Sequence, residues 1–354
     1  MLKLGFLTPS LFLGGAERWV ISLASGLQAM QPAGCVLTEH LNYDDTILEA
    51  ARQVMPSVLL PENDADTHQA IRSLAAKSNV LLSWGISDLA DLTRGIKVPV
   101  IEVSHSDGAW PDQRAMLARS SRGAWGHVGV SHTAATAFPP DMPRDPSVIY
   151  NGADANRAAP RWGREFLRDR LEIEAQRKVV LFLGRFSRVK RIDRLISAMT
   201  YLEDWECMLV GEGPEERNLR DMADSLAPGR VHFVPAVDHP GDCYAAADVF
   251  CLPSDYEGFP LVLAESWLAG LSTVTADFSF AREINQETGV EFCHIADRNN
   301  VQQLAAAISG APTPAKSSTT AAAWREFTLP RFVARWERYL TGVVSETSRG
   351  ALDR

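Results

Sequence analysis

Residues 251–270 read CLPSDYEGFPLVLAESWLAG, and this stretch decides the fold. The apolar run at 248–252 that leads into it predicts a buried strand, and the polar residues that follow have the composition of a turn. Pro260 suits the first turn of a helix, because its missing N–H would have no partner there. Residues 261–268 continue as that helix, and Gly270 can end it in the left-handed conformation.

Two glutamates flank the start of this predicted helix. The first turn leaves its N–H groups unpaired and carries the positive end of the helix dipole, so it attracts anions. Glu257 precedes that turn and Glu265 lies within the helix, roughly 10 Å away at about 1.5 Å per residue. Because a carboxylate beside a phosphate would be repelled, both should face hydroxyl groups. A sugar, a diphosphate and a ribose in line fit this pattern, so the stretch predicts a nucleotide-sugar site. An ordinary strand–helix unit with two solvated glutamates is the alternative.

The composition of the whole chain narrows the class of protein. A length of 354 residues favours two domains, and 46% hydrophobic with 22% charged residues is typical of a soluble globular protein. The net charge of -9 argues against sequence-independent nucleic-acid binding and leaves only weak peripheral membrane contact through a local patch. No stretch approaches the roughly 20 apolar residues of a membrane span.

The number and spacing of the cysteines indicate the redox state of the compartment in which the protein works. They are scattered, odd in number and contain no Cys-x-x-Cys, which predicts free thiols in a reducing, cytoplasmic environment. They are Cys35, Cys207, Cys243, Cys251 and Cys293. We expect Cys251, in the predicted strand, to belong to the core.

The first half of the chain alternates short apolar runs with helix-like segments, which predicts a parallel sheet. The first run, at 2–8, leads through Gly14 and Gly15 into a helix expected at 16–30. Paired glycines let backbone approach a ligand closely, and a plain turn is an equal alternative. His105 follows another strand end, where such sheets bind ligands, and could donate to a sugar hydroxyl or a developing charge. A satisfied loop histidine is the alternative.

One Asp-x-Asp pair, Asp64 and Asp66, has the pattern of a metal motif. It lies in the polar run ENDADTHQ, away from any predicted strand end. We therefore expect a solvated loop there and no metal site.

The second half opens on a strong apolar strand at 178–185 that ends in Gly-Arg and leads into another helix. Arg185 and Lys190 lie in the loop between them. Two cations at a strand end suit a diphosphate, because arginine can engage its oxygens in a bidentate fork. For either residue alone, a solvated charge cluster is the alternative.

Several motifs together resemble the retaining glycosyltransferases of family 4, which are group 1 glycosyl transferases. The resemblance is strongest between residues 179 and 270. The motifs are EGFPLVLAE at 257–265, GRF followed by Lys190, the Gly211–Pro214 turn, GGAER at 14–18 and VIYNGAD at 148–154.

The resemblance implies an α/β structure of the GT-B fold, with two Rossmann-like parallel-sheet domains facing a central cleft. The acceptor domain would span 1–155, with a C-terminal helix at 331–354 packing back on it. The donor domain would span 156–330.

The resemblance also implies retaining, metal-independent transfer of a sugar from a UDP- or GDP-type donor. The acceptor would be a hydroxyl of a glycan, a lipid-linked saccharide or a small metabolite, as in polysaccharide biosynthesis, and no cofactor is expected. Catalytic roles would fall to Glu257, His105, Arg185 and Lys190. Donor contacts would come from Gly14, Gly15, Arg185, Lys190, Gly211, Gly213, Gly258, Phe259, Pro260, Leu261, Val262 and Glu265.

The chain also departs from the family pattern. Arg191 and Pro235 stand where glycine is usual, and Ser279 and Phe280 replace a pair of glycines. A phenylalanine at 280 would fill space that backbone normally leaves open. Pro235, Ser279 and Phe280 favour an alternative function, a non-catalytic nucleotide-sugar binder or a partner subunit of an active transferase. Epimerases and phosphorylases that share the fold are a second alternative.

Overall fold

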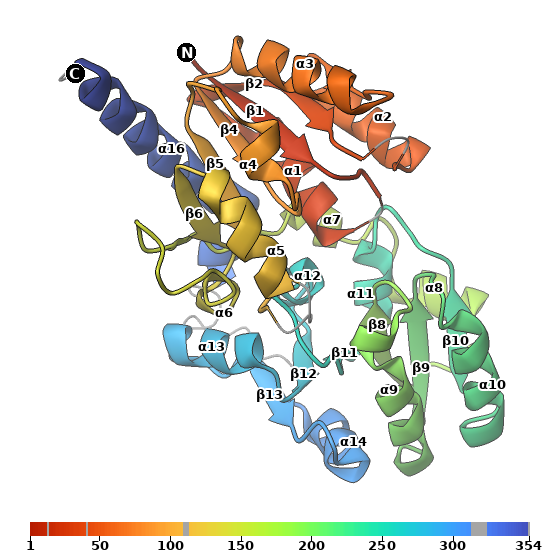
Figure 1. Cartoon of the computed structure of the whole chain (residues 1–354). Helices are drawn as coiled ribbons and strands as arrows, with labels where there is room; N and C mark the ends of the chain where they lie inside the picture. Colours follow the sequence, from red (N-terminus) through yellow and green to blue (C-terminus); the bar gives the residue numbers. More distant parts are fainter. Residues whose placement is uncertain (13, 40–41, 109–112, 313–323, 353–354) are drawn as a thin grey trace. The chain divides into compact units, whose positions relative to one another are not determined.

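The computed structural model describes the 354-residue chain except for residues 13, 40–41, 109–112, 313–323 and 353–354. The chain divides into two compact units (Figure 1). The first consists of Met1–Gly152 together with Leu329–Arg354, and the second is Ala153–Thr328.

The first unit is built on a parallel sheet that has seven strands over the described residues, in the order β3-β2-β1-β4-β5-β6-β7. The strands are β1 (Leu2–Thr8), β2 (Met30–Leu37), β3 (Val58–Leu59), β4 (Val80–Ser83), β5 (Val100–Ser104), β6 (Gly126–Gly129) and β7 (Ser147–Val148). Phe6 and Leu7 are both fully buried although successive side chains point to opposite faces, because helices cover both faces of the sheet.

The helices of the first unit form two layers. They are α1 (Gly15–Gly26), α2 (Asp45–Val54), α3 (Asp64–Ala75), α4 (Leu89–Leu92), α5 (Gln113–Ser120), η1 (Ser121–Gly123), α6 (His132–Ala135) and α16 (Leu329–Leu352). The helix α1 contacts α2 and α16, whereas α3 contacts α4, and α4, α5 and η1 contact one another.

The C-terminal helix α16 is anchored on the first unit by an aromatic contact and by a carboxylate. The rings of Trp336 and Trp19 of α1 meet edge to face with centroids 5.4 Å apart. Glu337 Oε1 accepts from the backbone N–H groups of Gln28, Ala29 and Met30 at 2.7, 2.6 and 3.1 Å. The contacts therefore join the last helix of the chain to the turn after its first helix.

The second unit has a parallel sheet of six strands over the described residues, in the order β10-β9-β8-β11-β12-β13. The strands are β8 (Lys178–Leu183), β9 (Trp205–Val210), β10 (Val231–Val234), β11 (Val249–Leu252), β12 (Ser272–Ala276) and β13 (Cys293–Ala296). The prediction of two Rossmann-like parallel-sheet α/β domains is confirmed.

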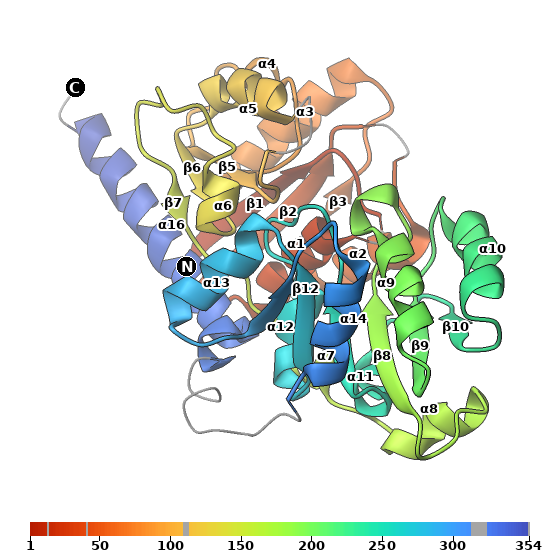
Figure 2. The same cartoon turned by 90° about the horizontal axis from the view of Figure 1, so that it is seen from below.

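Helices cover this second sheet as well. In Figure 2, α9 and α14 lie in front of its strands, and α9 also contacts α10, while α7 contacts α11 and α12. The helices are α7 (Ala155–Ala158), α8 (Arg164–Arg170), η2 (Arg188–Lys190), α9 (Ile192–Ala198), η3 (Met199–Tyr201), α10 (Glu216–Leu226), α11 (Gly241–Ala246), α12 (Leu261–Leu268), α13 (Ser279–Thr288), α14 (Val301–Gly310) and η4 (Arg325–Phe327).

Two local predictions for the first unit were wrong. The first helix ends at Gly26 and not at residue 30, because Met30 already begins β2 and pairs with Leu2. The Asp64–Asp66 segment is not a loop but the first turn of α3, where Asn63 Oδ1 accepts from Asp66 N at 3.0 Å. Acidic residues favour a helix N-terminus, which accounts for this polar run without a metal.

All five cysteines are buried and carry free thiols, and Cys251 belongs to the core as predicted.

A buried polar row crosses the first sheet at Glu102. In register, Glu102 of β5 lies between Ser83 of β4 and His127 of β6, and all three are at most 3% exposed. Ser120 Oγ donates to Glu102 Oε1, while Glu102 Oε2 has no hydrogen-bond partner among the described residues. Burial raises the pKa of Glu102 from 4.5 to about 8, because the charged form is desolvated.

Glu102 should therefore make the first unit less stable as the pH rises. Between about 4.5 and 8 the folded state keeps the proton that the unfolded chain has lost, so stability falls across that window by up to about 1.4 kcal/mol per pH unit. We expect Glu102→Gln to unfold at a higher temperature than the parent at pH 7.5, and the gap to shrink at pH 5. An equal gap at both pH values would contradict a protonated Glu102.

Candidate functional site

The predicted site residues of the second unit gather where its strand order reverses. The chain runs outward from β8 to β10 on one side and from β11 to β13 on the other, and β8 and β11 are neighbours. Open parallel sheets bind ligands outside the carboxyl ends of the strands at such a switch point. The loops at that point are 184–191 after β8 and 253–260 after β11.

The structure joins two residues that the sequence placed in separate roles. Lys190 Nζ lies 2.6 Å from Glu257 Oε1, and Ser254 Oγ donates to the same oxygen at 2.7 Å. The side chain of Glu257 is 10% exposed and that of Lys190 23%. The alternative of a solvated glutamate is therefore wrong for Glu257.

A network of arginines and Asp255 holds these two loops together. Asp255 N donates to Val189 O at 2.9 Å, and the Asp255 carboxylate pairs with Arg194 at 2.7 Å and with Arg191 at 3.5 Å. Arg194 Nη1 also donates to Pro253 O at 2.9 Å. Glu257 and Lys190 are thus carried by loops whose backbones are tied to each other.

Arg191 has a left-handed backbone conformation that favours glycine. Its φ and ψ are 48° and 44°, the left-handed region, where a side chain costs about 1–2 kcal/mol. The ion pairs of Arg191 with Asp193 (2.9 Å) and Asp255 offset part of that cost, and they raise its pKa. Arg191 therefore forms this left-handed turn and places a cation in it.

Glu265 is held inside the second unit by two donors. Arg157 Nε donates to Glu265 Oε1 at 2.7 Å, and Tyr244 OH donates to Glu265 Oε2 at 2.8 Å. Glu265 is 4% exposed, so the solvated alternative is wrong for this glutamate too. Burial and the neighbouring carboxylate raise the pKa of Tyr244 well above its usual value, so that it remains a donor.

The remaining residues around α12 divide between surface and core. Arg185 is exposed, and its side chain makes no ion pair with any described residue. Phe259 is buried, with its ring centroid 4.9 Å from that of Phe280. Phe280 is fully buried, so its ring lies in the interior of the second unit against Phe259. Leu261 begins α12 as predicted, but Pro260 is its N-cap.

Gly211 and Gly213 have a packing role. Both have positive φ, 143° and 158°, and a Cβ would lie 2.0 Å from Gly184 O at Gly211 and 2.3 Å from Phe186 O at Gly213. Hydrogen bonds join the same loops, since Phe186 N donates to Glu212 O at 2.7 Å. The turn after β9 thus supports the loop that carries Arg185 and Lys190.

Gly211→Ala should destabilise the second unit, because the new methyl group meets a carbonyl oxygen that cannot move alone. We expect a loss of about 2–4 kcal/mol, the scale of backbone strain combined with overpacking. Gly229→Ala is the matched control, because Gly229 also has positive φ (72°) but nothing lies within 4 Å of its Cβ position. Urea unfolding of the two variants measures the difference, and equal losses would contradict the packing role.

The first unit places His105 in an aromatic environment. His105 meets Trp19 edge to face with centroids 4.9 Å apart, and Trp84 lies 6.3 Å away. Its Nε2 is shielded from solvent and has no hydrogen-bond partner among the described residues. Burial lowers the pKa of His105 to about 3, so the ring is neutral at physiological pH.

The paired glycines after β1 are not required by the fold. Gly14 caps α1 with extended backbone, and a Cβ there would meet only the flexible end of Glu17. Nothing lies within 4 Å of the Cβ position of Gly15. The structure thus leaves open space at Gly15.

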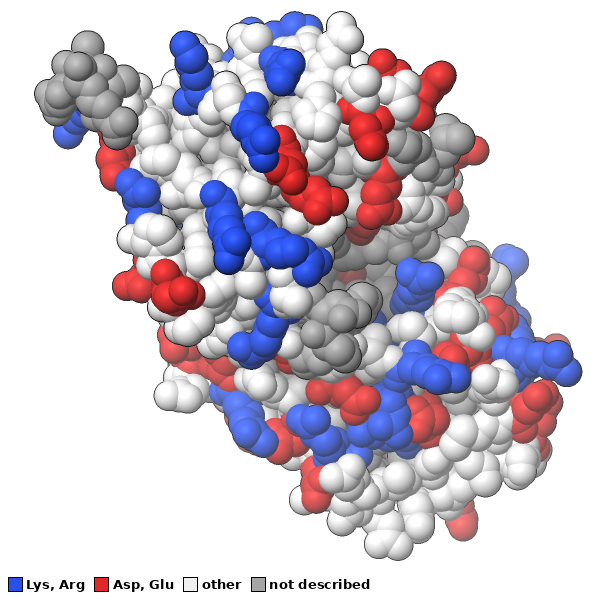
Figure 3. Space-filling view, in the orientation of Figure 1, with Lys and Arg blue, Asp and Glu red and all other residues white. Residues whose placement is uncertain are grey.

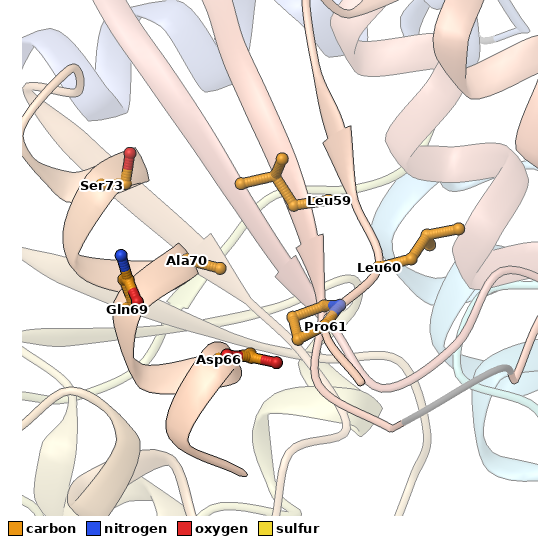
Figure 4. Close-up of a pocket in the computed structure, with 7 residues that line it drawn as sticks. All are labelled: Leu59, Leu60, Pro61, Asp66, Gln69, Ala70 and Ser73. Carbon is orange, nitrogen blue, oxygen red and sulfur yellow. The ribbon is translucent and has the colours of Figure 1, made fainter. Parts of the chain in front are cut away.

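A pocket of about 350 Å³ lies in the first unit, between the end of β3 and α3 (Figure 4). Its lining includes Leu59, Pro61 and Asp66 but none of the predicted site residues. No group of three or more His, Cys, Asp or Glu within the described ranges is placed to hold a metal ion. None of the helices that the structure describes is both long and apolar enough to cross a bilayer.

Charges on the face of the second unit seen in Figure 3 are mixed, with Lys and Arg side chains interspersed among Asp and Glu. Exposed pairs such as Arg220–Glu216, 2.8 Å apart, contribute little to stability. The less exposed Lys190–Glu257 and Arg157–Glu265 pairs differ from them, because they are largely withdrawn from water.

Sequence reasoning missed three residues of this site: Arg157, Tyr244 and Ser254. Ser254 had a local signal, since it lies three residues before Glu257 in the same turn. Arg157 and Tyr244 are 108 and 21 residues from Glu265, and neither belongs to a motif that marks a site.

Comparison with known proteins gives a family match within the second unit. Residues 163–312 match the family described as glycosyl transferases group 1. A lipopolysaccharide core biosynthesis glycosyltransferase, LpsE of Rhizobium meliloti, is 36% identical over 109 residues, 30% of this chain and 32% of that protein. A GDP-mannose-dependent alpha-mannosyltransferase of Corynebacterium glutamicum is 25% identical over 193 residues, 51% of this chain and 46% of that protein. The chain thus matches about a third to a half of the length of these relatives.

The whole fold is shared with solved structures. HepE of Anabaena, crystallised with UDP and glucose, has a TM-score of 0.81 at 20% identity, over 97% of this chain and 100% of that one. Sucrose-phosphate synthase of Thermosynechococcus elongatus has a TM-score of 0.74 at 18% identity, over 98% and 100%. These likenesses confirm the predicted GT-B fold class. Residues 163–312, which match the group 1 glycosyl transferases, lie inside the second unit.

Proposed function

We propose that the protein is a retaining glycosyltransferase that moves a sugar from a nucleoside diphosphate sugar to a hydroxyl acceptor. The observation that carries the proposal is the Lys190–Glu257 pair, 2.6 Å apart at the switch point of the second sheet and directly before α12. A cation, a carboxylate and a helix N-terminus meet there, which are the groups that a sugar diphosphate requires.

In the proposed mechanism the bond between the sugar C1 and the diphosphate oxygen breaks, and the diphosphate leaves with the electron pair. Arg185, Lys190 and the first N–H groups of α12 stabilise the negative charge as it develops. Glu257 contacts hydroxyls of the donor sugar and steadies the oxocarbenium-like centre. The acceptor oxygen then bonds to C1 on the face that the diphosphate leaves, and a diphosphate oxygen takes its proton.

Within this proposal, Glu265 accepts from the ribose hydroxyls of the donor. Because His105 is neutral, it serves as a hydrogen-bond donor to substrate and not as a fixed positive charge. The open space at Gly15 supports close approach of substrate to the first unit. Arg185 and Lys190 supply positive charge to the diphosphate, so we propose that transfer needs no metal.

The donor is proposed to be of the UDP or GDP type. HepE was crystallised with UDP-glucose, and the Corynebacterium relative is named for GDP-mannose, so both bases occur among similar proteins. The acceptor is proposed to be a glycan, a lipid-linked saccharide or a small metabolite. Lipopolysaccharide core biosynthesis in the name of the Rhizobium relative favours a saccharide acceptor.

A thermal-shift titration with UDP, GDP, ADP and TDP, each with EDTA, tests this function. A ligand that binds only the folded state raises its stability by about 2.7 kcal/mol at 100 times Kd. We expect one nucleotide to shift the transition clearly, and its sugar conjugates to be consumed only when an acceptor is added. Release of free sugar without acceptor would point to a hydrolase or epimerase. No shift with any of the four would contradict the proposed function.

A further inference from the structure

The environment of Glu265 carries an inference that deepens the proposed function and rests on it. Glu265 lies about one turn after Leu261 in α12, and helical side chains tilt toward the N-terminus, so its side chain leans toward the end that carries the proposed diphosphate site. The carboxylate is held at both oxygens, by Arg157 at Oε1 and by Tyr244 at Oε2. A carboxylate offers about four lone-pair sites, so one remains on each oxygen.

The backbone that carries Arg157 is itself fixed. Arg157 belongs to α7, which contacts α11 and α12. Asp154 caps α7 by accepting from Asn156 N at 2.9 Å, and His239 Nε2 lies 2.8 Å from Ala159 O at the end of that helix. Arg157 Nη1 also donates to Asp238 O. The guanidinium is therefore held from both sides and fixes the carboxylate in turn.

Stability alone is a weak reason for such a pair. A buried ion pair is expensive to desolvate, and apolar residues of similar volume often stabilise a fold as well or better. The side chains of Arg157 and Glu265 are only 18% and 6% exposed. A carboxylate that must accept from a ligand in one orientation gives a direct reason for both donors.

We propose that Arg157 and Tyr244 are positioning residues that orient Glu265 to accept from the two ribose hydroxyls of the nucleotide. Arg157 lies just after the boundary between the two units, at residues 152 and 153. The same contact therefore links the segment that leaves the first unit to recognition of the donor ribose.

The test compares UDP and GDP with their 2′,3′-dideoxy analogues by calorimetry on the full chain. In the parent, loss of both hydroxyls should weaken binding about 10- to 100-fold, the scale of hydrogen bonds to a charged group. The ratio of the Kd of the dideoxy analogue to the Kd of the ordinary nucleotide measures this loss. In Arg157→Gln and Tyr244→Phe the ratio should fall by about 10-fold, while the Kd of the dideoxy analogue stays within about 3-fold of the parent value. Arg161→Gln is the control, because Arg161 is exposed in the same segment and should keep the parent ratio.

Each other result has a separate meaning. If Arg157→Gln keeps the parent ratio, or weakens both nucleotides equally, Arg157 is only structural and the inference is wrong. If the parent binds a nucleotide without preferring the ribose hydroxyls, the role of Glu265 is wrong while nucleotide binding stands. If the parent binds none of the four nucleotides UDP, GDP, ADP and TDP, both the proposed function and the inference are contradicted. Tyr244→Phe loses one hydroxyl only, so it gives an answer even if Arg157→Gln does not fold.

Discussion

Replacement of Glu257 by glutamine is expected to lower the rate of sugar transfer by about 10²- to 10³-fold while nucleotide binding is kept. The amide has nearly the shape of the carboxylate but no charge to oppose positive charge at the sugar C1. Glu257 Oε1 also accepts from Lys190 and Ser254, so glutamine frees Lys190 for the diphosphate. We therefore expect kcat to fall and the Kd of the nucleoside diphosphate to stay equal or decrease.

The measurement is product formation under saturating donor, together with the Kd of the nucleotide identified by thermal shift. Glu216→Gln is the matched control, because Glu216 forms an exposed pair with Arg220 within α10. Equal turnover of Glu257→Gln and the parent would remove Glu257 from the reacting centre. Loss of nucleotide binding alone would assign it to the donor diphosphate or base and not to the sugar.

The sequence could predict the strands and the helix that carry this site, because the sequence patterns that mark them are local. The apolar runs at β8 and β11 are short, continuous and followed by Gly-containing turns, so both strands and α12 were found within a few residues. The sequence placed Lys190 after one strand and Glu257 after another, and only the structure shows that these strands, β8 and β11, are neighbours. The ends of the elements were predicted less accurately than the elements themselves. The first helix was predicted to extend past Gly26, because residues 27–30 lack a strong stop signal.

The contacts between side chains could not be predicted, because they join residues that are distant in sequence. Arg157 reaches Glu265 across 108 residues, and nothing in NRAAP marks an arginine with a buried partner. The packing of the Phe280 side chain could not be predicted either. Its ring packs on Phe259 inside the second unit, in the second position of α13, which starts at Ser279.

Replacement of Lys190 by alanine is expected to lower kcat/KM by about 10²-fold or more, the scale of a lost partner for developing negative charge. The change removes the cation beside the proposed diphosphate and also leaves Glu257 without its ion-pair partner. A carboxylate freed in this way would repel the diphosphate. Binding of the nucleoside diphosphate should therefore weaken, whereas binding of the nucleoside alone should change by less than about 3-fold.

Arg188→Ala is the matched control for Lys190→Ala, because Arg188 lies in the same turn, η2, with a side chain that is 90% exposed and paired with Glu215 at 3.2 Å. Its removal should leave kcat/KM nearly unchanged. Lys190→Arg keeps the charge but changes its shape, so partial activity in that variant would show that Lys190 acts mainly through charge. If Lys190→Ala and Arg188→Ala lost the same small amount of activity, the Lys190–Glu257 pair would be structural, and the diphosphate would have to rely on Arg185 and the first turn of α12.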